Sequence, residues 1–248
     1  MTKKEDRNEQ ILLDIVEEYI KTAEPVSSGY LLKKHKYDIS SATLRNIMAS
    51  LDEAGFLYQP HTSAGRVPTR KAYQFFVDKV ALGSREMPKK EKKSKARVSE
   101  QFKKELREAM KESPDMAAHM LSRHLAEMTN AMAFAGLLSI NHFYKEGLRY
   151  LLDEPEFINT ENIRSLVEYA DSLERRIDKL YKAIQDDIRV YIGDFASRSE
   201  DTPFSLMAFT SELPGHERGI FGIIGPMRMQ YNENLRLLDD IRDLFEEY

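Results

Sequence analysis

Apolar residues in the first third of the chain recur every three or four positions in three segments, which is the spacing of amphipathic helices. The first segment covers residues 11–20, and a shorter one covers residues 26–35 after a break at Pro25. The third lies between Ser40, a favoured N-cap type, and Gly55, which suits a left-handed helix end. We therefore expect three helices here, the third over residues 40–54.

The residues after the third helix have the pattern of a short hairpin. "FLYQP" (56–60) and "GRVPT" (65–69) read as two strands joined by "HTSA", and helical spacing resumes over residues 69–82. Gly65 permits a tight turn, and the two prolines fit strands at a sheet edge. Three helices, a hairpin and a further helix predict a winged helix-turn-helix over residues 1–82.

The rest of the chain mixes helical and strand spacing. Residues 83–98 lack apolar periodicity and carry Gly, Ser, Pro and a Lys run, which is typical of a basic linker. Helices are expected at 99–112, 114–129, 160–185 and 232–248, and strands at 131–140, 188–195, 204–213 and 219–226. Residues 99–248 should therefore form an α+β domain with long helices and a small sheet.

Charge divides the chain in a way that limits its partners. Residues 1–82 hold 12 Lys+Arg against 11 Asp+Glu, residues 83–112 hold 11 against 6, and residues 113–248 hold 14 against 24. An acidic C-terminal half repels nucleic acid, so any such contact belongs to the first half. The 248 residues include no cysteine, no secretory signal pattern and no long apolar run, so a soluble cytoplasmic protein without a membrane segment is expected.

The loop "YQPHTSAGRVPTRKAY" (58–73) lies in a segment, residues 54–77, that contains no Asp or Glu. As a hydrolase site it is incomplete, because a pair such as Ser63 and His61 needs an orienting acid and an oxyanion hole. A solvated loop without a role is the simplest alternative. A cationic wing that lies along DNA phosphates explains more of its composition.

Two groups of residues are candidates for contacts with double-stranded DNA. A recognition helix enters the major groove with its N-terminal side chains toward base edges, where Arg pairs with guanine and Asn with adenine. The residues expected to read bases are Ser41, Thr43, Arg45 and Asn46. Those expected to hold the backbone are Lys33, Lys34, His61, Thr62, Ser63, Arg66, Arg70 and Lys71.

The histidines and the glycine-rich segment of the C-terminal half predict no catalytic site, metal site or cofactor. His119 and His124 are five residues apart, which places them on different faces of a helix. "GIFGIIGPMRM" has glycines but no dinucleotide-binding spacing, and we expect Arg228 within it to anchor its own domain rather than bind a ligand.

Several motifs together resemble one family. "ILLDIVEEYIKTAEPVSSGYLL", "SSATLRNIMASLDEAGFLYQPHTSAGRVPTRKAYQFFVD" and the distant "IIGPMRMQY" are similar to the HrcA family of heat-inducible transcription repressors. "PHTSAGRVPT" and "GPMRMQY" are highly specific to it, and "GLRYLLDEPEF" and "VYIGDF" also resemble its C-terminal pattern.

The resemblance implies a homodimer that binds an inverted-repeat operator of chaperone operons and is kept active by the chaperonin GroEL. It also implies a GAF-like C-terminal domain. Between "AMAFAGLLSI" and "EGLRYLLDEPEF" this chain has almost none of the family's usual long segment, so a reduced GAF-like domain is expected. We then expect the dimer contact from helices at 99–129 and 160–190, whose apolar stripes a small domain buries incompletely.

The sequence thus predicts a DNA-binding repressor of heat-shock genes and not an enzyme. The alternative is a winged-helix module for protein association or ligand sensing without operator binding. The polar Arg45 and Asn46 on the exposed helix face favour the first interpretation.

Overall fold

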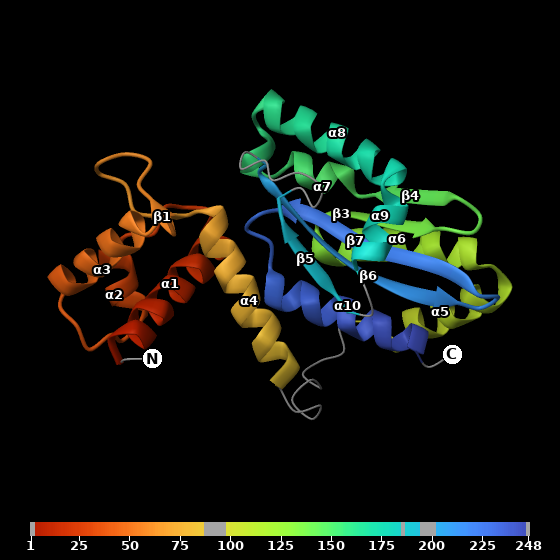
Figure 1. The fold of residues 1–248 in the computed structure, drawn as a ribbon, viewed down its shortest axis with the longest axis horizontal. Helices are drawn as coiled ribbons and strands as arrows, with labels where there is room; N and C mark the ends of the chain where they lie inside the picture. The colour runs from red at the N-terminus through yellow and green to blue at the C-terminus, as the bar shows by residue number, and fades with distance from the viewer. Residues whose placement is uncertain (1–2, 87–97, 185–186, 194–201, 247–248) are drawn as a thin grey trace. The chain divides into compact units, whose positions relative to one another are not determined.

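The computed structural model describes residues 3–86, 98–184, 187–193 and 202–246. The chain divides into two compact units, Met1–Leu82 and Gly83–Tyr248, which we call the first and second units. Both are visible in Figure 1. In the described residues no helix combines the length and apolar content needed to cross a membrane.

The first unit contains helices and one two-stranded antiparallel ribbon. Its elements are α1 (Lys3–Thr22), α2 (Ser28–Lys34), α3 (Ser41–Glu53), β1 (Leu57–Tyr58), β2 (Val67–Pro68) and α4 (Arg70–Glu86). Ser40 caps α3 by accepting a hydrogen bond from the Thr43 amide at 3.1 Å, and Gly55 follows the helix at a φ of +74°. Both predicted ends of this helix are confirmed.

The ribbon is shorter than the two five-residue strands that the sequence predicts. Only Leu57 and Tyr58 pair with Pro68 and Val67. Pro68 has no amide proton to donate to the ribbon, and a side chain rather than the partner strand bonds the carbonyl groups of the loop. The Gln59 side chain donates to the carbonyl oxygens of residues 62 and 64, at 3.0 and 2.9 Å.

The second unit is an α+β structure around one five-stranded antiparallel sheet in the order β4-β3-β7-β6-β5. Its strands are β3 (Met132–Leu137), β4 (His142–Glu146), β5 (Arg189–Ile192), β6 (Phe204–Leu213) and β7 (Glu217–Pro226). Its helices are α5 (Glu100–Glu112), α6 (Pro114–Thr129), α7 (Leu148–Leu152), the 3₁₀ turn η2 (Pro155–Phe157), α8 (Thr160–Arg175), α9 (Ile177–Ala183) and α10 (Tyr231–Glu246).

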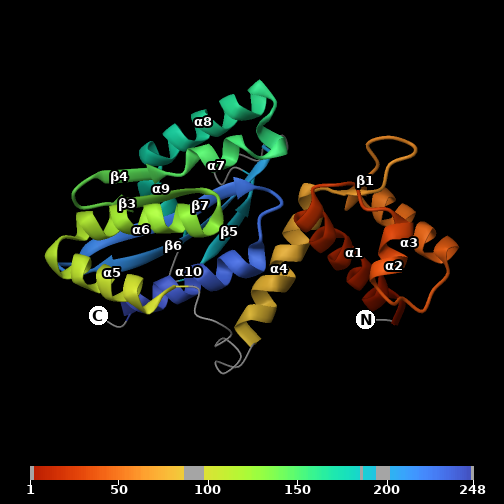
Figure 2. The same ribbon diagram turned by 180° about the vertical axis from the view of Figure 1, so that it is seen from behind.

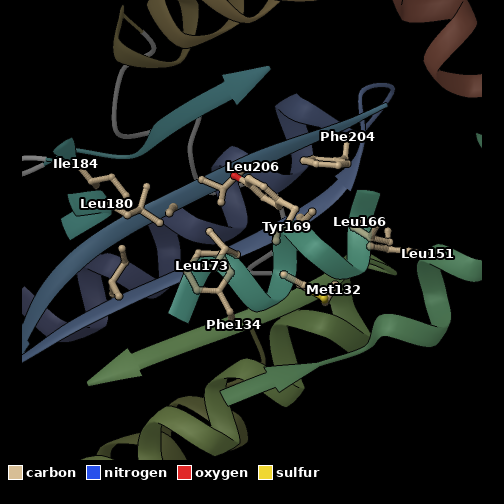
Figure 3. Close-up of a cluster of buried hydrophobic side chains, with 14 of the residues drawn as sticks. Met132, Phe134, Leu151, Leu166, Tyr169, Leu173, Leu180, Ile184, Phe204 and Leu206 are labelled. Atoms are coloured by element: carbon tan, nitrogen blue, oxygen red, sulfur yellow. The ribbon is translucent and has the colours of Figure 1, made fainter. Parts of the chain in front are cut away.

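Helices cover both faces of the sheet, as Figure 2 shows from behind. Leu166, Tyr169 and Leu173 of α8 pack on one face, against strand residues that include Phe134 and Leu206 (Figure 3). Strand residues between these point to the other face because side chains alternate along a strand. There Phe221 of β7 stacks on Phe245 of α10, with ring centroids 5.0 Å apart, and α6 packs on β3 and β7.

Four sequence predictions need correction. The expected strand 131–140 ends at Leu137 and turns back as β4, which the sequence missed. The short helix α7 was missed as well, and the predicted helix 160–185 breaks at Arg176 into α8 and α9. Helix α4 continues to Glu86 and Val98 is fully buried, so both ends of the predicted linker 83–98 belong to folded structure. Residues 87–97 lie outside the described residues.

The break at Arg176 changes which residues meet the sheet. Ile177 packs so closely on β3 that a Cβ added at Gly136 would lie 1.9 Å from its Cδ1. The glycine therefore leaves the space that Ile177 occupies.

Candidate nucleic-acid interface

The N-terminal half of α3 presents the four residues predicted to read bases. Arg45 and Asn46 are exposed, whereas Ser41 and Thr43 are half-buried. The Arg45 guanidinium donates a hydrogen bond from Nη2 to Ser41 Oγ at 3.2 Å, and no ion pair restrains it among the described residues. The apolar side of the helix, with Leu44, is buried. The helix therefore presents a polar, accessible face on one side while its apolar side packs into the core.

Hydroxyl groups at the start of α3 also contact one another. The Ser40 and Thr43 hydroxyl oxygens lie 2.9 Å apart, so one hydrogen-bonding position of Thr43 is already used. Arg45 and Asn46 have more freedom to meet a ligand than Thr43.

The loop between the two ribbon strands exposes His61, Thr62 and Ser63. Its base is fixed to the residues before α2, because Val26 and Arg66 exchange two backbone hydrogen bonds, at 2.9 and 2.8 Å. Gly65 lies so close to this segment that an added Cβ would stand 2.4 Å from the Val26 carbonyl carbon. The glycine is required here by a close backbone approach.

Arg66 is not the free cation that the acid-free segment suggests. Its Nε lies 2.9 Å from Asp52 Oδ2 on α3, as an ion pair without the alignment of a hydrogen bond. Asp52 precedes the acid-free segment in sequence but adjoins the loop in space. The ion pair neutralises the cation and joins the loop to α3.

Lys71 also has an internal role. Its Nζ donates to the carbonyl oxygen of Ala54 at 2.8 Å and lies 4.2 Å from the centre of the Phe56 ring. A cation at the C-terminal end of α3 compensates the unpaired carbonyl groups there. Arg70, the first residue of α4, is half-buried.

The two predicted backbone lysines of α2 differ from each other. Lys33 is exposed and has no ion pair among the residues that the structure describes. Lys34 instead donates to Glu18 Oε2 of α1 at 2.7 Å. Burial alone would raise the pKa of Glu18, but hydrogen bonds from Lys34 and Tyr30 outweigh it and hold this pKa below its ordinary value. The Lys34 charge is therefore used within the protein.

The sequence missed Asp14 and Glu18 as structural acids, although a signal was present. They are four residues apart in a helix whose neighbouring positions, Ile11 and Ile15, are apolar, so they share its buried face. An acid at such a position needs a partner.

In the second unit Arg228 anchors its own fold, as the sequence predicts. Its guanidinium donates to Glu156 Oε1 of η2 at 2.6 Å and also bonds Glu154, the residue before η2. Only 13% of the Arg228 side chain is exposed. Burial alone would lower the Arg228 pKa, but the two carboxylates raise it on balance.

The two histidines of α6 have different surroundings. His119 lies 3.0 Å from Glu146 and stacks on Tyr144, whereas His124 stacks on Phe102 of α5 at 3.5 Å between ring centroids. Tyr144 and Glu146 belong to β4, which also holds His142, and His142 lies 2.5 Å from Asp115. In the described residues no group of three or more His, Cys, Asp or Glu side chains is arranged to hold a metal ion.

The helices proposed to form the dimer contact bury most of their apolar side chains inside the second unit. Phe102, Leu106 and Met110 of α5 are covered, and α8 packs on the sheet. Met116 and Met128 of α6 and Val167 of α8 stay exposed, so the dimer contact expected from these helices stays a prediction, with a smaller apolar surface than the sequence suggests.

Comparisons with known proteins indicate one family over most of the chain. The family described as the HrcA protein C-terminal domain matches residues 88–234. A heat-inducible transcription repressor HrcA from Natranaerobius thermophilus is 26% identical over 324 aligned positions, which cover 95% of this chain and 94% of that repressor. Because 324 positions exceed the 248 residues of this chain, that repressor contains inserted residues that this chain lacks.

Two further comparisons cover different shares of the chain. A heat-inducible transcription repressor HrcA from Thermodesulfovibrio yellowstonii is 58% identical over 74 residues, which are 30% of this chain and 21% of that repressor. The crystal structure of a hypothetical protein aligns with 98% of both chains at a TM-score of 0.77 and 20% identity, so the two proteins share a fold.

Proposed function

The chain belongs to the HrcA family of heat-inducible transcription repressors, and on this premise we propose that its first unit binds an operator in DNA. The family match over residues 88–234 and the chain-wide relative carry this premise. In this proposal residues 1–82 are a winged helix-turn-helix in which α3 reads bases and the loop after β1 is the wing. A regulator rather than an enzyme is the class that the relatives indicate.

The observation that carries the proposal is the exposed, polar N-terminal half of α3. Its residues Arg45 and Asn46 have the donors and acceptors that distinguish base pairs in the major groove. The half-buried Ser41 and Thr43 lie about one turn earlier on the same helix. The core of a surface for protein association would be more apolar than this polar face.

The expected phosphate contacts form a smaller set than the sequence suggests. Lys33 and the exposed loop residues His61, Thr62 and Ser63 are the strongest backbone candidates, because Lys34, Arg66 and Lys71 have partners within the protein. Arg70 stays in the proposed set at the start of α4.

For the second unit we propose the effector and dimerisation role of a reduced GAF-like domain. Its five-stranded antiparallel sheet, covered on both faces by helices, supports this class of fold. A dimer would place two first units on the arms of an inverted repeat, since protein symmetry and operator symmetry correspond. Modulation by the chaperonin GroEL follows from the family resemblance.

Fluorescence anisotropy of the full chain tests this function. Labelled inverted-repeat and scrambled duplexes are titrated at about 50 and about 200 mM salt, since phosphate contacts lose affinity steeply over that range. We expect an operator preference that persists at the higher salt. Equal affinities for both duplexes, with and without added GroEL, would contradict the proposal.

A further inference from the structure

Two buried acids on α1 face the helix-turn-helix. Asp14 is 7% exposed and Glu18 is 1% exposed, and they lie one turn apart on the same side of the helix. Burying a carboxylate is unfavourable unless charges and hydrogen bonds compensate it. Their partners therefore identify what these acids hold in place.

Among the described residues, the polar contacts of the Glu18 carboxylate with other elements lead to α2 or to the residue that ends it. The Tyr30 hydroxyl and Lys34 Nζ both donate to Glu18 Oε2 at 2.7 Å, and Lys34 is also 3.0 Å from the Tyr30 oxygen. On the other oxygen, His35 Nε2 stands 3.6 Å from Oε1. Lys21 of the same helix adds a cation at 3.6 Å.

Asp14 holds the turn that follows α2. The Tyr37 hydroxyl donates to Asp14 Oδ2 at 2.5 Å, and His35 Nδ1 is 3.6 Å from the same oxygen. The rings of His35 and Tyr37 stack with centroids 5.5 Å apart. His35, which caps the C-terminus of α2, thus lies between both acids.

Apolar packing alone fixes α2 weakly. The helix has seven residues, of which only Leu31 is fully buried. It packs against α3, which begins at Ser41, four residues after Tyr37. Figure 2 shows α2 beside α3. A movement of the turn at residues 35–40 would therefore move Arg45 and Asn46.

We propose that Asp14 and Glu18 fix the turn between α2 and α3, and that Lys34, His35 and Tyr37 are positioning residues for the reading helix rather than DNA contacts. This inference rests on the proposed function of the first unit. It reassigns Lys34, whose sequence context suggests a phosphate contact, to the orientation of α3.

Neighbouring lysines provide a matched test in the full-length protein. Lys34→Met, Tyr37→Phe and Lys33→Met are compared by anisotropy over a salt series with operator and scrambled duplexes. Lys33→Met should weaken both duplexes equally and reduce the slope of log K against log salt by about 1. Lys34→Met should leave that slope unchanged and lower the operator preference by at least roughly fivefold, the smallest loss expected for one bidentate base contact.

Tyr37→Phe removes one hydroxyl and no charge, so it carries the test if Lys34→Met does not fold. It should lower operator preference with an unchanged salt slope. Hydrogen–deuterium exchange of residues 28–54 gives a readout independent of DNA, and it should increase in Lys34→Met and Tyr37→Phe but not in Lys33→Met.

The outcomes separate the two proposals. A Lys34→Met variant with a reduced salt slope, equal weakening of both duplexes and unchanged exchange would overturn the positioning role. A wild-type protein without operator preference would contradict the proposed function, while the exchange data would still decide whether the acids hold the turn.

Discussion

Arg66, in the loop between the ribbon strands, forms an ion pair with Asp52 on α3, with Nε 2.9 Å from Oδ2. The pair joins the two parts of the first unit that we propose to contact DNA. It also places an acid beside a loop whose own sequence has none. The ion pair thus neutralises a cation that has no acid near it in the sequence of the loop.

Asp52→Asn should release the Arg66 charge for phosphate. We expect tighter binding to operator and scrambled duplexes alike, with a salt slope steeper by about 1, because one more cation displaces counterions. Anisotropy over a salt series measures both. Glu53→Gln is the matched control, since it removes the same charge from the exposed neighbouring position. An equal effect of the two substitutions would show that net charge alone matters.

Gly65→Ala should displace the loop from the segment before α2. The new Cβ would stand 2.4 Å from a backbone carbon, so we expect a loss of more than about 1 kcal/mol in the free energy of unfolding. Gly29→Ala is the control, because nothing lies within 4 Å and the position is helical. That change should be neutral or stabilise by up to about 1 kcal/mol. Equal thermal stability of the two variants would contradict the crowding at Gly65.

Glu18 should make the first unit sensitive to acid. Its pKa lies below the ordinary 4.5 because the hydrogen bonds from Lys34 and Tyr30 outweigh burial, which acts in the opposite direction. A carboxyl with a lowered folded-state pKa contributes stability that is complete above the unfolded value and is lost as pH falls through the folded value. The loss therefore occurs below about pH 4.5.

Lys34→Met removes the larger of these hydrogen bonds, so the pKa of Glu18 should rise toward its unfolded value and the stability lost on acidification should become smaller. A ¹³C NMR titration of the side-chain carboxyl groups follows Glu18 directly. The same Glu18 titration in the variant and the wild type would show that Lys34 does not stabilise the carboxylate.

Arg228 should be essential to the second unit. Arg228→Met leaves Glu154 and Glu156 without their common partner in a largely buried site, and we expect a loss of about 3 kcal/mol in urea unfolding. Arg164→Met breaks the exposed pair with Glu168 and should cost at most about 0.5 kcal/mol. Similar losses in the two variants would be inconsistent with the anchoring role.

Local signals account for the parts of the fold that the sequence predicted. Ser40 and Gly55 define α3 because caps act within a few residues of a helix end. The edge strand β4 was missed because its side chains are all exposed or half-buried, so it lacks the alternation of a strand that buries one face.

The internal partners of the charged residues were not predicted, for a different reason. Lys34 and Glu18 are 16 residues apart, and Arg228 and Glu156 are 72 apart, so each pair exists only after folding. For Arg228 the sequence predicted an internal role but no partner. For Lys34 and Arg66 it predicted free cations, because a one-dimensional count of acids omits those that other elements bring near.

Reading of an operator by α3 is tested by the ratio of operator to scrambled affinity in Arg45→Ala. Arg45 is exposed and its side chain bonds Ser41 of the same helix, so its loss should disturb the fold little. We expect the ratio to fall close to 1 in Arg45→Ala, while Lys33→Ala weakens both duplexes and keeps the wild-type ratio. Uniform weakening in both variants, with the ratio unchanged, would show that α3 is not the reader.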